Sequence, residues 1–168
     1  MDGQPHQNHQ NHHEHHFAQL NVGRVLQPLD HPDMLEFTAM LDVVNRMAEL
    51  SPGFVWRLKT EDGGSSSYVE VFDDPLLLVN ISVWERREDL RHYVYKSGHG
   101  AYLRRRGEWF ERSAGIHTVC WWIPAGTLPD VHDAVRRLEL LRVYGPTDDG
   151  ATPRQRFRNS GSGGGALR

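Results

Sequence analysis

The segment from Tyr95 to Phe110 carries most of the side chains that could do chemistry. At about 100° per residue, one face of an uninterrupted helix would hold two phenols, an imidazole, a guanidinium and a phenyl ring. They belong to Tyr95, His99, Tyr102, Arg106 and Phe110. Such groups could bind and protonate a polar atom of an otherwise apolar ligand. The same positions could also form an amphipathic face whose polar tips reach water.

Two glycines, Gly98 and Gly100, flank His99 and predict a break in that helix. A break beside a histidine lets the imidazole be aimed independently of the helix. We therefore interpret His99 as a candidate acid or base, with Arg106 and Tyr95 as candidates that orient a substrate oxygen. The alternative is a histidine without a functional role.

Other chemical signatures are weak in this sequence. It has no phosphate loop, dinucleotide fingerprint, nucleophile elbow or paired-histidine zinc motif. The single cysteine, Cys120, excludes an internal disulfide, and its apolar neighbours predict a buried structural thiol. Six N-terminal histidines could bind transition metals adventitiously, but a polar tail lacks the rigid geometry of a fixed site. They are His6, His9, His12, His13, His15 and His16.

Charge and length limit the class of protein. The 168 residues carry a formal net charge of −3, so electrostatics do not indicate nucleic-acid binding. No apolar run approaches the roughly 18 residues of a membrane span, and no signal-peptide pattern opens the chain, so we expect a cytoplasmic protein without a membrane partner. Residues 1–16 and 147–168 have few apolar side chains. We expect these two segments to be disordered tails around one domain at 17–146.

Hydrophobic periodicity predicts the order β-α-β-β-α-β with an extra C-terminal helix. The expected strands are 17–25, 54–59, 76–84 and 118–123, with a short strand or bulged extension at 68–72. The expected helices are 34–50, 87–111 with a break at 97–100, and 128–143. Two right-handed β-α-β units give an α+β, ferredoxin-like antiparallel sheet with helices on one face. A second copy usually covers the other face and closes a dimeric α/β barrel.

The two central strands each divide into an apolar and a mixed face. The apolar faces suit packing against helices, and they comprise Ala18, Leu20, Val22, Leu77, Val79, Ile81 and Val83. The mixed faces comprise Phe17, Gln19, Asn21, Leu78, Asn80, Ser82 and Trp84. A mixed face suits either a dimer interface or the wall of a pocket. Exposed aromatic side chains such as Phe17 and Trp84 would favour a homodimer.

Aromatic side chains are the remaining candidates for ligand contacts. The sequence has five tryptophans, which usually serve as core or dimer contacts and could also line a pocket for a flat ligand. Trp121 and Trp122 are consecutive on a strand, so both faces of the sheet must be covered there. Our ligand-binding candidates are Trp84, Tyr102, Trp109, Phe110, Asn80 and Asn21.

The string Asn80-Ile81-Ser82-Val83-Trp84, followed by Leu90, Tyr93-Val94-Tyr95, Ser97 and His99, resembles a bacterial domain-of-unknown-function family (DUF3291). That family belongs to the dimeric α/β-barrel superfamily. The resemblance continues through Trp121-Trp122-Ile123-Pro124-Ala125-Gly126 and covers about residues 17–146. The family usually has a histidine after the glycine of this turn, where the present chain has Thr127.

Residues 83–99 are more distantly similar to antibiotic-biosynthesis monooxygenases and haem-degrading monooxygenases. In those families a helix histidine and a strand tryptophan line the pocket, and the matching positions are His99 and Trp84. The resemblance implies an enzyme, monooxygenase-like or cyclase- or isomerase-like, acting without a cofactor on a small apolar or aromatic metabolite of a biosynthetic pathway. The alternatives are a non-catalytic ligand-binding or scaffold dimer, and a haem protein with His99 as axial ligand.

Overall fold

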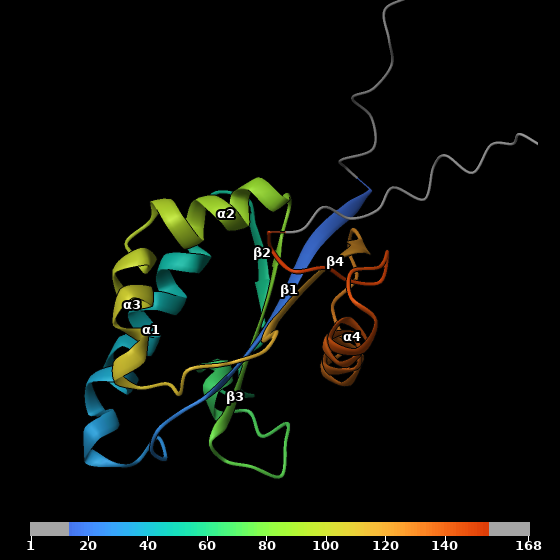
Figure 1. Cartoon of the computed structure of the whole chain (residues 1–168). Coiled ribbons are helices and arrows are strands. Elements are labelled where there is room, and N and C mark those ends of the chain that lie inside the picture. The colour runs from blue at the N-terminus through green and yellow to red at the C-terminus, as the bar shows by residue number, and fades with distance from the viewer. Residues whose placement is uncertain (1–13, 155–168) are drawn as a thin grey trace, which may run out of the picture.

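The computed structural model describes residues 14–154, which form one antiparallel sheet with helices on both faces (Figure 1). The strands lie in the order β2-β3-β1-β4. They are β1 (His15–Arg24), β2 (Phe54–Arg57), β3 (Leu77–Trp84) and β4 (Thr118–Pro124). The helices are α1 (Leu35–Glu49), α2 (Arg87–Lys96), α3 (His99–Arg105) and α4 (Val131–Tyr144). The predicted α+β, ferredoxin-like fold is confirmed.

The mixed and apolar faces of the sheet have different covers (Figure 1). Helix α4 packs on the apolar face, where Ala134, Leu138 and Leu141 join the buried side chains of β1, β3 and β4. Helices α1, α2 and α3 lie over the mixed face (Figure 1). The β1–β3 pairing sets Asn21 opposite Asn80, so two amide side chains lie side by side on the mixed face. No helix of the described residues is long and apolar enough to cross a membrane.

Phe17 and Trp84 are buried within the chain, at 1% and 0% exposed. They pack with Ala48 of α1 and with Leu90 and Tyr93 of α2. The expectation that these two aromatic side chains form an exposed patch is therefore wrong, because α1 and α2 cover the mixed face. The homodimer stays a prediction, but the burial of Phe17 and Trp84 removes this argument in its favour.

The described residues include short segments on both sides of the expected domain, 17–146. His15 and His16 lie in β1, opposite Pro124 and Ile123 of β4. On the other edge of β4, Cys120 exchanges two backbone hydrogen bonds with Ala151, at 2.8 and 3.0 Å. His15 and His16 extend the ladder between β1 and β4, whereas Ala151 pairs with the outer side of β4, which would otherwise be an open sheet edge. The rest of the predicted tails, with His6, His9, His12 and His13, lies outside the described residues.

The predicted strand extension at 68–72 does not form. A short 3-10 turn, Ser66–Tyr68, includes the first residue of this segment, and the Ser65 hydroxyl accepts the backbone N–H of Ser67 at 3.2 Å. Local bonds from serine side chains to the backbone compete with a strand ladder. The buried Arg57 also donates to the carbonyl of Gly64 at 3.0 Å and pairs with Glu49 at 2.9 Å, which ties this loop to α1.

The N-terminus of α4, the helix that packs on the apolar face, allows a test of how much its N-cap stabilises the protein. Asp130 is the N-cap, and its carboxylate accepts the backbone N–H of Asp133 at 2.9 Å. We expect Asp130→Ala to lower the free energy of unfolding by about 1 kcal/mol, measured by urea titration. Asp130→Asn keeps the acceptor and should lose much less. Equal losses in the two variants would show that the cap contributes nothing.

Candidate ligand-binding and catalytic site

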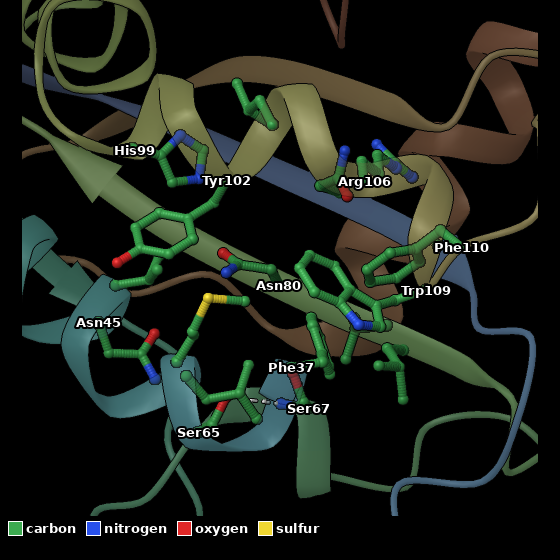
Figure 2. Close-up of a pocket in the computed structure, with 18 residues that line it drawn as sticks. Phe37, Asn45, Ser65, Ser67, Asn80, His99, Tyr102, Arg106, Trp109 and Phe110 are labelled. Carbon is green, nitrogen blue, oxygen red and sulfur yellow. Dashed lines mark hydrogen bonds between the residues drawn. The ribbon is translucent and has the colours of Figure 1, made fainter. Parts of the chain in front are cut away.

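A cavity of about 170 Å³ lies between the mixed face of the sheet and helices α1 and α3 (Figure 2). Its polar lining consists of Asn21, Asn45, Ser65, Ser67, Asn80, His99, Tyr102 and Arg106. Its aromatic lining is Phe37, Trp109 and Phe110. All the predicted site residues except Tyr95 and Trp84 line this cavity, which we call the inner cavity. A cavity of about 150 Å³ is large enough to hold benzene.

A larger cavity of about 730 Å³ adjoins the inner one, and we call it the outer cavity. The two share six lining residues, namely Asn21, Val44, Asn80, His99, Leu103 and Arg106. From there the outer cavity extends over Gln19 and Ser82 to α2 and to residues 152–154. Its volume lies in the range of small-molecule sites. The mixed face of the sheet is thus the wall of a pocket.

His99 is the first residue of α3 and lies at the junction of the two cavities. The predicted helix break is present, since α2 ends at Lys96. The Ser97 hydroxyl stabilises the break: it donates to the carbonyl of Tyr93 and accepts the backbone N–H of His99 at 3.1 Å. This local network holds the imidazole at the cavity wall.

The environment of the His99 ring favours its neutral form. Burial lowers the pKa of His99, and a backbone hydrogen bond with Val94 opposes the shift only in part. The Nδ1 atom is buried and has no hydrogen-bond partner among residues 14–154. A neutral imidazole with an unpartnered ring nitrogen can accept a proton from a ligand.

Trp84 lines neither cavity, and it is connected to His99 through the ring of Tyr93. Its ring stacks on Tyr93 with centroids 5.1 Å apart, and Tyr93 lies against His99 at 4.7 Å. The Trp84 indole N–H donates to the Ser82 hydroxyl at 3.0 Å. Tyr93 donates to the carbonyl of Val44 at 3.2 Å, and burial raises the pKa of its phenol. These contacts fix the plane against which the imidazole rests.

Arg106 brings a positive charge to the cavity wall. Its guanidinium lies 5.0 Å from the centre of the Phe110 ring, and burial lowers its pKa. Among the described residues it forms no ion pair with a carboxylate. The neighbouring Arg105, by contrast, pairs with Glu36 at 2.6 Å and Glu108 at 2.7 Å. The charge of Arg106 is therefore available to a ligand.

Tyr95 is not part of the inner cavity. It lies on α2, is 58% exposed and contributes only to the wall of the outer cavity. The helical phase that joins Tyr95 to Tyr102 requires one continuous helix. The break between α2 and α3 changes the direction of the chain, so that phase is lost.

Asn45 is a site residue that the sequence analysis did not identify. It lies on α1, is 8% exposed and lines the inner cavity. Its Nδ2 atom is buried and has no hydrogen-bond partner in the described part of the chain. A buried amide donor without a partner is costly, so a ligand acceptor at this position would stabilise it. The available signal was its position between Leu41 and Ala48, inside the apolar stripe of the helix.

The described residues hold no cluster of three or more His, Cys, Asp or Glu side chains that could bind a metal ion. Cys120 is buried as expected, and burial raises the pKa of its thiol to about 12. Haem ligation by His99 stays a prediction. It would require a ring nitrogen facing the outer cavity and space there for a planar porphyrin.

Fold and cavity together define a ferredoxin-like α+β protein with a ligand-sized site between its sheet and helices. The chain belongs to the family described as Domain of unknown function (DUF3291), which matches residues 16–163. The resemblance seen in the sequence is thereby confirmed. No curated protein matches the chain.

Several solved structures are similar to this chain at low identity. SnoaB, a cofactor-independent oxygenase from Streptomyces nogalater, is 17% identical over 68% of this chain and 98% of its own, with a TM-score of 0.45. A provisionally assigned antibiotic biosynthesis monooxygenase from Nitrosomonas europaea is 16% identical over 68% and 92%, with a TM-score of 0.37. Rv0793 from Mycobacterium tuberculosis is 18% identical over 69% and 98%, with a TM-score of 0.38. These values support no transfer of activity.

Proposed function

We propose that the protein is an enzyme that moves a proton on a small, largely apolar metabolite, as monooxygenase-like, cyclase-like and isomerase-like reactions require. The observation that carries the proposal is the pairing of a largely neutral, buried imidazole with an uncompensated guanidinium at the wall of one apolar cavity. A base and a cation in a water-poor site can generate and stabilise an oxyanion.

The proposed step uses only groups of this chain and the substrate. A ring nitrogen of His99 accepts a proton from a substrate C–H bond that is conjugated with a carbonyl group, either directly or through intervening double bonds. The electron pair of that bond forms a C=C bond, and the carbonyl electrons move to oxygen, which gives an enolate. The Arg106 guanidinium stabilises the enolate oxygen. Return of the proton from His99 to another carbon completes an isomerisation.

The spacing of the two residues favours a conjugated substrate. His99 and Arg106 are seven positions apart, which corresponds to roughly 10 Å along a helix. In an aromatic or polycyclic body, charge generated near the base is delocalised toward an oxygen at the other end. Phe37, Trp109 and Phe110 provide flat apolar walls for such a body (Figure 2).

Proton exchange on a neutral aromatic ketone tests the proposal. We expect the wild-type protein to accelerate hydrogen–deuterium exchange of 2-tetralone in D2O at least tenfold over buffer, followed by NMR. His99→Gln should return the rate to that of buffer, because the amide cannot act as the base. The rate should fall at acidic pH, at a lower pH than for a solvent-exposed histidine, because burial lowers the pKa of His99.

A matched control is available on the opposite face of the sheet. His132 lies exposed on α4, so His132→Gln should exchange 2-tetralone at the wild-type rate. Circular dichroism checks that both variants are folded. Full activity in His99→Gln would remove the residue from the mechanism. Binding of 2-tetralone by the wild type without any exchange would identify a non-catalytic binding module instead.

A further inference from the structure

The outer cavity has a one-sided charge distribution. Four arginines line it, namely Arg87, Arg91, Arg106 and Arg154, together with His99 and His117. Within the described residues, neither this cavity nor the inner one is lined by an aspartate or a glutamate. The whole chain carries a net charge of −3, so this separation of charge is local. A concave wall with charges of one sign concentrates ligands of the opposite sign.

The inner cavity adds an independent observation. Asn45 lines this cavity, and its Nδ2 atom is a buried donor without a hydrogen-bond partner among the described residues. Figure 2 shows Asn45 and Arg106 toward opposite ends of this cavity. Both groups donate hydrogen bonds, so a ligand that satisfies them presents an acceptor oxygen at each end.

From these observations we infer that the substrate is an amphipathic anion, with an aromatic body in the inner cavity and a carboxylate tail in the outer cavity. The carboxylate lies beside Arg91 in the outer cavity, an arginine that pairs with no carboxylate of the described chain, while Arg106 at the junction faces the enolate oxygen of the proposed step and adds its charge to the attraction. A second ring oxygen accepts from Asn45 at the far end of the inner cavity. This inference rests on the proposed function for the location of the site and adds the chemical class of the substrate.

The volumes of the two cavities also place the tail in the outer one. The inner cavity, at about 170 Å³, has room for little more than one ring, whereas the outer cavity has about 730 Å³. The two join at His99 and Arg106. A ligand that spans the junction therefore passes the proposed base while its charged end stays among the arginines.

Calorimetric titration with matched probes tests the inference. We expect 4-phenylbutanoate to bind at least tenfold more tightly than the neutral 4-phenylbutanamide in 50 mM salt. The preference should shrink in 500 mM salt, because ions screen the attraction. Arg91→Gln should reduce the preference for the acid several-fold, and Arg106→Gln should reduce it further. Arg104→Gln is the control, since Arg104 is exposed on α3 and lines neither cavity.

The possible failures separate this inference from the proposed function. Equal affinity for the acid and the amide would overturn the anionic class of substrate, as would an acid preference that survives Arg91→Gln and Arg106→Gln together. If neither probe binds, the inference that one ligand occupies both cavities is wrong. The exchange assay uses neutral 2-tetralone, so its outcome does not depend on a charged tail.

Discussion

Replacing Trp84 with alanine should destabilise the protein by about 3–5 kcal/mol, the range found when a fully buried large aromatic side chain is removed. Trp84 is 0% exposed. It meets Phe54 edge-on at 5.5 Å and stacks on Tyr93 at 5.1 Å. The deletion leaves a cavity between β3, β2 and α2, and it leaves the Ser82 hydroxyl without its indole donor.

The measurement is urea unfolding followed by tryptophan fluorescence, with Trp122→Ala as the matched control. Trp122 is 37% exposed and packs on Phe17 at 4.8 Å, so its removal should cost about 1–2 kcal/mol. Trp84→Ala should also slow proton exchange in the folded fraction, because Tyr93 loses the surface that holds it against His99. Equal losses of stability in the two variants would refute the structural role given to Trp84.

The order of the elements follows from the sequence because each strand has its own alternation of apolar and polar residues. The strand at 76–84 separates Val79, Ile81 and Val83 from Asn80 and Ser82, and the structure covers these two faces differently. Local pattern alone does not decide which helix covers which face. For that reason the sequence left two roles open for the mixed face, a dimer interface or the wall of a pocket.

The candidate site was predictable where the residues lie on one uninterrupted element. Tyr102 lies on α3, which begins at His99, and Arg106 directly follows the last residue of that helix, so all three side chains reach the wall of the inner cavity. Tyr95 precedes the break and is directed elsewhere. The break itself was visible as Gly98 and Gly100, but the change of direction that it produces depends on the hydrogen bonds of Ser97.

The sequence could not predict which arginine of the site is paired with a carboxylate. Arg105 and Arg106 are adjacent and chemically identical in the sequence. Arg105 is neutralised by Glu36, which lies 69 positions away on α1, whereas Arg106 faces a cavity without carboxylates. Only the packing of α3 on α1 distinguishes the two side chains. Asn45 of α1 is buried at the same cavity, and its Nδ2 atom has no hydrogen-bond partner among the described residues.

The second large effect is expected at the turn before β2, where Gly53 has a φ of 75°. A Cβ atom placed on Gly53 would lie 2.2 Å from Oδ2 and 2.7 Å from Cβ of Asp89, in the first turn of α2. The turn cannot move away freely, because the Gly53 carbonyl accepts the backbone N–H of Glu85 at 2.7 Å. Gly53→Ala therefore forces α2 to shift on the sheet.

We expect Gly53→Ala to lose about 2–5 kcal/mol, from roughly 1–2 kcal/mol of left-handed backbone strain and about 1–3 kcal/mol of overpacking. Gly63→Ala separates the two contributions. Gly63 has a φ of 87° and nothing within 4 Å of its added Cβ, so it should lose only the backbone part. Urea unfolding measures both variants. Because α2 carries Tyr93, the Gly53→Ala protein should also show weaker proton exchange, whereas Gly63→Ala should match the wild type. Equal losses of stability would mean that the contact with Asp89 does not constrain α2.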